Sequence, residues 1–203
     1  DSGLFDIALI GVLEDRNSIN NIGTALAPDA FRQKFYELNE GNYNTRIVDL
    51  GNIRAGHKVS DTYVALKLLV AELIKKNILP VIIGGGQDLT YPQFMAYEEL
   101  EQKVDLLVVD SHFDLDDNID GTIETTSISY LNKIFLHEPN FLFNFSNIGY
   151  QTFYVNQESL KLMDKLYFDV HRLGDFAGNI NLAEPVIRNA NMLSFDISAI
   201  RSS

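Results

Sequence analysis

The chain has 203 residues and carries 28 acidic against 16 basic side chains, a formal net charge of −12. This charge argues against nucleic acid or an anionic membrane surface as partner, and it suits a cationic small substrate or a metal ion. Hydrophobic residues make up 46% of the chain, enough for the core of one α/β domain, and no window reaches the ~18 apolar residues of a membrane span. There is no cysteine, which suits a cytoplasmic protein without disulfides or thiolate chemistry.

Neither end of the sequence resembles a natural terminus. The N-terminal segment lacks the basic start and the long apolar run of a secretory signal. The first residue is Asp1 rather than Met, and the last residue, Ser203, follows closely on an apolar strand. We therefore expect a fragment of a longer chain that lacks its C-terminal part.

Strands and helices are expected to alternate along the first half of the chain. Apolar runs predict buried strands at 4–12, 46–50 and 78–83. Pro28 and Asp29 favour a helix that begins near residue 27 and ends near Asn39 and Gly41. A second helix is expected to be capped by Ser60. Its apolar face consists of Leu66, Leu69, Val70, Leu73 and Ile74.

The same alternation continues through the second half. Helices are expected at 91–102, 127–136, 157–166 and 183–190. Strands are expected at 106–109, 147–150, 166–170 and 191–197. This order predicts an α/β layered fold with a mostly parallel sheet. With no internal repeat and no linker, we expect one domain over residues 1–203.

Three strands are followed by unusual polar sequences: GGGQD at 84–88, DSHFD at 110–114 and SFDIS at 194–198. The carboxyl ends of parallel strands share one edge of a sheet, where ligands and catalytic groups gather, so these segments can converge. The glycine run allows a close backbone approach or positive φ. It lacks the spacing of a phosphate loop, so a plain strand-to-helix turn is favoured over a nucleotide site.

The segment 110–114 is the strongest candidate for a metal site. Asp110, His112 and Asp114 alternate, so an extended backbone aims all three at one side. Two carboxylates and an imidazole make a suitable first shell for a divalent metal. The alternative is a polar loop that caps the next helix. Asp196 is likewise either a further ligand at the exit of a buried strand, or a carboxylate that caps a helix or lies in a loop.

At these three segments the chain resembles the ureohydrolase superfamily of arginase, agmatinase and formimidoylglutamase. Residues 27–32 (APDAFR) resemble the family's Gly-Pro-x-x-Ile-Arg helix start, and residues 148–151 (IGYQ) resemble its Ile-Gly-x-Arg strand. The triple glycine at 84–86 is most similar to the formimidoylglutamase branch. The resemblance implies a three-layer α/β/α fold of the arginase type.

The resemblance also implies a pair of Mn²⁺ ions that activate a hydroxide against a guanidinium or formimino carbon. Asp110, His112, Asp114 and Asp196 match the family's metal ligands, and Asp114 or a nearby carboxylate would handle the proton. Gln87 stands where the family has a histidine, and Ser198 where it has an aspartate. Because an amide oxygen and a hydroxyl are weaker ligands, we expect a degenerate site that binds one or two ions less tightly.

Two functions remain open. The first is a metal-dependent hydrolase of C–N bonds in linear amidines or guanidines such as formimidoylglutamate, agmatine or arginine. The second is a catalytically impaired relative that serves as a binding or structural module. A two-metal phosphoesterase is disfavoured, because His57, His137 and His171 lie outside the strand-end motifs. The family also suggests a homo-oligomer.

Overall fold

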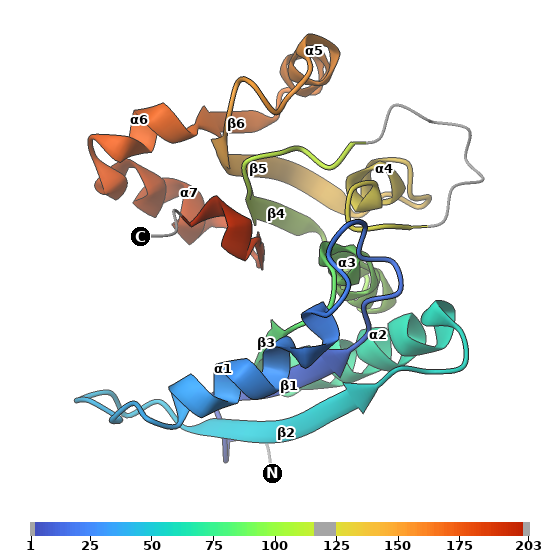
Figure 1. The fold of residues 1–203 in the computed structure, drawn as a ribbon, viewed down its shortest axis with the longest axis vertical. Helices are drawn as coiled ribbons and strands as arrows, with labels where there is room; N and C mark the ends of the chain where they lie inside the picture. Colours follow the sequence, from blue (N-terminus) through green and yellow to red (C-terminus); the bar gives the residue numbers. More distant parts are fainter. Residues whose placement is uncertain (1–2, 116–124, 201–203) are drawn as a thin grey trace. The chain divides into compact units, whose positions relative to one another are not determined.

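The computed structural model describes residues 3–115 and 125–200 (Figure 1). These residues fall into two compact units, which are described separately. Unit 1 comprises the described residues of 1–100 together with 125–127, and unit 2 comprises those of 101–124 and 128–203. Every strand pairing within the two units is parallel. The predicted α/β class with a mostly parallel sheet is confirmed. The single domain over 1–203 stays a prediction.

Unit 1 contains a three-stranded sheet in the order β2-β1-β3. Its strands are β1 (Ile7–Leu13), β2 (Ile47–Arg54) and β3 (Leu79–Ile83). Its helices are α1 (Ala27–Phe35), α2 (Val59–Lys75) and α3 (Thr90–Glu99), with the short 3-10 helices η1 (Thr24–Leu26) and η2 (Gln87–Leu89).

The central strand β1 is covered on both faces. Ala8, Ile10 and Val12 alternate along it and pack in one core cluster with residues of α2 and α3. The opposite face carries Gly11, where an added Cβ would lie 2.8 Å from the Cβ of Pro28 at the start of α1. Helices therefore lie on both sides of this sheet, as α1 and α2 show in Figure 1.

Arg32 fixes α1 against β2. Its Nε and Nη2 donate to the two carboxylate oxygens of Asp49 at 2.6 and 2.8 Å, and its Nη1 donates to Asn52 Oδ1 at 2.6 Å. Hydrogen bonding to this guanidinium holds the pKa of Asp49 well below its usual range. The arginine of the 27–32 motif thus has a structural role, the attachment of the first helix to an outer strand.

Unit 2 contains a four-stranded sheet in the order β6-β5-β4-β7. Its strands are β4 (Val104–Val109), β5 (Leu142–Tyr150), β6 (Asp169–Arg172) and β7 (Met192–Phe195). Its helices are α4 (Tyr130–Phe135), α5 (Gln157–Lys165), α6 (Leu173–Ala177) and α7 (Ala183–Asn189), with the 3-10 helices η3 (Ile180–Leu182) and η4 (Ile197–Ala199).

This second sheet is also covered on both faces. Leu107 of β4 and Ile148 of β5 form a core cluster with residues of α6 and α7. On the other face, the ring of Phe145 meets that of Phe135 at the end of α4 edge to face, with centroids 5.2 Å apart. The buried pattern of β4 agrees with a strand inside a parallel sheet.

Some element boundaries differ from the prediction. Helix α1 ends at Phe35, before the expected end near Gly41. Ser60 lies inside α2, whose N-cap is Lys58; the carboxylate of Asp61 accepts the Lys58 N–H at 2.8 Å and caps the helix from its third position. Helix α6 was not expected, because five residues are too few for a helical periodicity to show.

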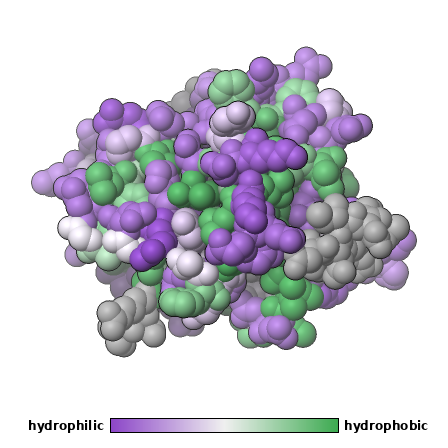
Figure 2. All heavy atoms as spheres, turned by 90° about the horizontal axis from the view of Figure 1, so that it is seen from above, coloured by the Kyte–Doolittle hydropathy of each residue, from purple (hydrophilic) through white to green (hydrophobic). Residues whose placement is uncertain are grey.

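The described residues contain no helix that is long and apolar enough to cross a membrane. On the face drawn in Figure 2, hydrophilic residues predominate, and hydrophobic residues lie in several groups between them. A mixed surface of this kind is ordinary for a globular protein.

Candidate metal centre

The candidate site begins where β4 ends. Asp110 follows the last residue of that strand, and its N–H still donates to the carbonyl of Ile148 on β5 at 3.1 Å. Its carboxylate accepts the N–H of His112 at 2.9 Å and so closes a tight turn. Asp110 is 1% exposed, whereas the side chain of His112 is 50% exposed. The strand end thus presents a buried carboxylate next to an accessible imidazole.

Asp196 is brought beside this strand end by the pairing of β7 with β4. Its N–H donates to the carbonyl of Val109 at 3.0 Å. Its carboxylate accepts the N–H of Ser198 at 2.7 Å, which caps η4. Two of the three strand-end segments singled out in the sequence, 110–114 and 194–198, therefore meet within unit 2.

Asp114 completes a group of interacting carboxyl groups. It adopts φ +44°, and its side chain is hydrogen-bonded to that of Asp110. Burial, followed by the charge of Asp110, raises the pKa of Asp114 well above its usual range. Burial also raises the pKa of Asp110, with a further contribution from the charge of Asp196. These carboxyl groups lie close enough to repel one another, and a proton or a cation relieves that repulsion.

The donor set fits a divalent cation. Carboxylate oxygens and an imidazole nitrogen are ligands that Mn²⁺ and similar ions accept. Within residues 3–115 and 125–200 no three histidine or acidic side chains stand in the geometry of a ready-made metal site. The carboxyl groups of Asp110 and Asp114 are instead hydrogen-bonded to each other. A cation bound at this position would take the place of the hydrogen bond between the two carboxyl groups.

The imidazole of His112 has contacts of its own. Its Nδ1 lies 2.9 Å from Ser111 Oγ and 3.7 Å from Asp110 Oδ1. The ring of Tyr154 stacks on it, with centroids 4.8 Å apart and planes inclined by 11°. The imidazole is thus held at one edge and on one face.

Two further residues lie at the site and were not predicted from the sequence. Asn147 of β5 is fully buried, and its Nδ2 donates to the carbonyl oxygens of Asp110 at 3.5 Å and His112 at 3.4 Å. Its Oδ1 has no hydrogen-bond partner among the residues that the structure describes. A polar residue on a core-facing position of an apolar strand was a usable signal. Tyr130 of α4 is buried beside the carboxylates, and its side chain is hydrogen-bonded to that of Ser194. It gave no signal, because it belongs to an ordinary apolar helix face.

The two departures from the family's ligand pattern lie in different units. Ser198 is an exposed residue of η4, and its N–H donates to the Asp196 carboxylate that caps this 3-10 helix. Gln87 is the first residue of η2 in unit 1. Asp110, His112, Asp114, Asp196 and Ser198 are therefore gathered in unit 2, and the participation of Gln87 stays a prediction.

The glycine run at 84–86 is explained by both reasons given from the sequence. Gly84 and Gly85 have φ of +89° and +74°. A Cβ at Gly85 would lie 2.3 Å from the side chain of Leu89 and 2.7 Å from the carbonyl oxygen of Glu14. The turn after β3 therefore requires left-handed backbone and a close approach between chain segments.

Substitution of Gly85 by alanine should destabilise the protein severely. The added methyl group meets a backbone oxygen in a conformation that L-residues avoid, so we expect a loss of about 3 kcal/mol or more in urea unfolding. Gly178→Ala is the matched control, since its Cβ would meet nothing within 4 Å and its φ is −89°. Equal stability of the two variants would contradict the strain assigned to the turn.

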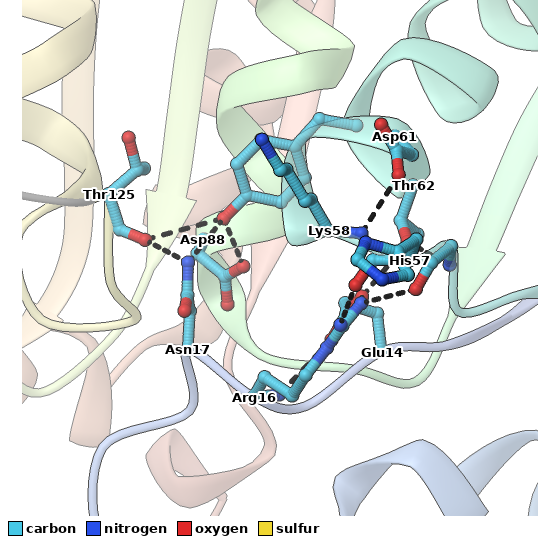
Figure 3. Close-up of polar contacts among 11 residues, drawn as sticks. Glu14, Arg16, Asn17, His57, Lys58, Asp61, Thr62, Asp88 and Thr125 are labelled. Atoms are coloured by element: carbon cyan, nitrogen blue, oxygen red, sulfur yellow. Dashed lines mark hydrogen bonds and ion pairs between the residues drawn. The ribbon is translucent and has the colours of Figure 1, made fainter.

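A polar network in unit 1 holds the turn that carries Gln87 (Figure 3). Asp88 is 1% exposed, and its Oδ2 accepts the hydroxyl of Tyr63 at 2.5 Å. Burial raises the pKa of Asp88 to about 6. Nearby, Asn17 Nδ2 donates to the carbonyl of Thr125 at 2.7 Å. These bonds join the turn after β3 to helix α2, and the loop after β1 to segment 125–127.

The protein is a layered α/β protein, because helices cover its sheets of parallel strands. The carboxylates and the histidine at the strand ends form a candidate metal centre. The chain belongs to the Arginase family, whose family model matches residues 5–203. The predicted resemblance to the ureohydrolases is thereby confirmed.

Individual relatives agree with the formimidoylglutamase branch. The chain is 34% identical over 130 residues to a formimidoylglutamase of Macrococcus caseolyticus, a match that covers 60% of this chain and 40% of that enzyme. The fold is similar to that of the Trypanosoma cruzi formiminoglutamase solved with Mn²⁺, with a TM-score of 0.83 and 20% identity over 95% of this chain and 70% of the other. Formimidoylglutamase from Bacillus subtilis gives a TM-score of 0.76 at 19% identity, over 96% and 66% of the two chains.

Proposed function

We propose that this chain carries the metal centre of a Mn²⁺-dependent hydrolase that acts on linear amidines. The observation that supports the proposal is the group formed by Asp110, His112, Asp114 and Asp196 at the ends of β4 and β7. Their mutual repulsion suits a cation, and the family and its formimidoylglutamase relatives suit an amidine substrate.

Each residue of the site has a proposed role in this reaction. Asp110, His112, Asp114 and Asp196 hold the metal, which when bound supplies a Lewis acid and lowers the pKa of bound water. Water adds to the amidine carbon, and the C–N bond breaks. Asp114 accepts the proton from the attacking water and passes it to the leaving nitrogen. Asn147 supports the backbone of Asp110 and His112 from inside the sheet.

Formimidoylglutamate is the first substrate to test, with agmatine and arginine as the alternatives. We further propose a cytoplasmic enzyme that forms homo-oligomers and binds neither nucleic acid nor membranes. The net charge of −12 favours a substrate whose reacting group is a cationic amidinium.

The direct test is hydrolysis of formimidoylglutamate, agmatine and arginine by protein loaded with Mn²⁺, compared with protein treated with a chelator. We expect one of the three to be hydrolysed only with metal. Turnover that survives complete chelation, or no turnover of any of them with metal bound, would contradict the proposal.

The alternative is a catalytically impaired relative that acts as a binding or structural module. It is favoured by the residues at 87 and 198, where a glutamine and a serine stand in place of stronger metal ligands. Metal binding without turnover of any amidine is the result that this alternative predicts.

A further inference from the structure

The ring of Tyr154 lies almost parallel to the imidazole of His112, with 4.8 Å between centroids and 11° between planes. Tyr154 belongs to the loop between β5 and α5 and matches none of the segments singled out in the sequence. Stacked aromatic pairs at this separation attract each other beyond the area that they bury. The contact therefore restrains a side chain that is otherwise half exposed.

The two contacts of the imidazole restrain different motions. The short distance from Nδ1 to Ser111 Oγ holds one edge of the ring in its own plane. A single bond at the edge still allows the plane to tilt about it. Tyr154 blocks that tilt, because it covers one face of the ring. Edge and face together define one orientation of the imidazole.

Tyr154 is itself fixed to the strand end that carries His112. The N–H of Gln151 donates to the carbonyl of Ser111 at 3.0 Å, and the N–H of Tyr154 donates to the carbonyl of Gln151 at 2.9 Å. Val155, the next residue, is 8% exposed and anchors the loop in the core. The tyrosine ring is thus presented from a loop that is hydrogen-bonded to the residue preceding the histidine.

We propose that Tyr154 is a positioning residue that fixes the imidazole plane of His112 for metal binding. The consequence for metal affinity depends on the proposed function, whereas the fixed orientation of the ring does not. Groups that orient a ligating histidine commonly change metal affinity by tenfold or more. The face of Tyr154, rather than its hydroxyl, carries this effect.

The orientation is tested by proton NMR of the metal-free protein. The His112 ring signals are assigned by their loss in His112→Gln. The facing tyrosine ring should shift them upfield, and this shift should disappear in Tyr154→Leu and persist in Tyr154→Phe. Phe153→Leu is the matched control, since Phe153 is the neighbouring residue and is 97% exposed. An unchanged His112 signal in Tyr154→Leu overturns the proposal.

Calorimetric titration with Mn²⁺ tests the consequence. We expect about tenfold weaker binding in Tyr154→Leu, with Tyr154→Phe and Phe153→Leu close to the parent. Thermal melts verify folding, and Tyr154→Met replaces the leucine variant if that variant unfolds. Equal affinity in parent and Tyr154→Leu overturns the positioning role. A parent that binds no Mn²⁺ but loses the upfield shift in Tyr154→Leu contradicts the proposed function alone.

Discussion

Asp114→Asn should abolish the stabilisation by Mn²⁺ and yet make the metal-free protein more stable. In the metal-free protein the carboxyl groups of Asp110, Asp114 and Asp196 repel one another. Because the pKa of Asp114 is raised on folding, at neutral pH the folded protein bears the cost of either a buried charge or the uptake of a proton at this group. Asparagine removes that cost at nearly constant volume, and it tolerates the left-handed backbone at φ +44°. Residues built to hold a ligand commonly reduce stability when the ligand is absent.

Both effects can be read from thermal unfolding. Without metal, the melting temperature of the variant should rise by about 2–4 °C for each kcal/mol of repulsion removed. At a free Mn²⁺ concentration about 100 times its dissociation constant, the parent should gain about 2.7 kcal/mol. Loss of a ligand that weakens binding by at least about 100-fold leaves the variant with less than about 0.5 kcal/mol of that gain.

Asp164→Asn is the matched control, since it neutralises an exposed aspartate of α5 in the same unit. It should respond to Mn²⁺ as the parent does. A variant Asp114→Asn that keeps the full shift by Mn²⁺ contradicts the assignment of Asp114 as a ligand.

Ser198→Asp should raise the Mn²⁺ affinity by about tenfold or more. The N–H of Ser198 donates to the carboxylate of Asp196, so an aspartate at position 198 adds a carboxylate next to the existing group. A carboxylate is a stronger ligand for Mn²⁺ than a hydroxyl. The same charge adds repulsion, so the metal-free variant should be less stable than the parent. Calorimetry with Mn²⁺ and thermal melts measure the two effects.

Ser198→Asn is the control for side-chain size, because asparagine has nearly the volume of aspartate but no charge. This variant should bind Mn²⁺ with an affinity near that of the parent. Gln87→His tests the other departure separately, because residue 87 lies in unit 1. Amidine hydrolysis that appears only after both replacements supports the impaired alternative, and hydrolysis by the parent contradicts it. No gain in affinity from Ser198→Asp would contradict the view that residue 198 is a ligand position.

The sequence was sufficient for the α/β class because the strands of a parallel sheet are apolar along most of their length, as β1 and β4 are. The start of the long helix α2, which has a regular apolar face, was located to within two residues. The short α6 and the end of α1 were not, since packing and local capping decide such boundaries.

Some residues of the candidate site could likewise be predicted from the sequence, and others could not. Asp110, His112 and Asp196 follow apolar strands and could be singled out from the sequence, whereas Tyr130 and Tyr154 could not. An aromatic residue in a helix face or a loop has many structural roles, and its contact with a distant histidine or carboxylate depends on tertiary structure alone. The left-handed conformation of Asp114 was also invisible in the sequence.

The most direct test of the account is an anomalous difference map at the manganese absorption edge, from crystals of the parent grown with Mn²⁺. We predict a peak within about 2.0–2.3 Å of donor atoms of His112 and Asp196, with Asp110 and Asp114 completing the shell. The peak should be absent from crystals of Asp114→Asn grown in the same way. An ordered strand end without any anomalous peak in the parent, at millimolar Mn²⁺, would contradict the assignment of this group as the metal centre.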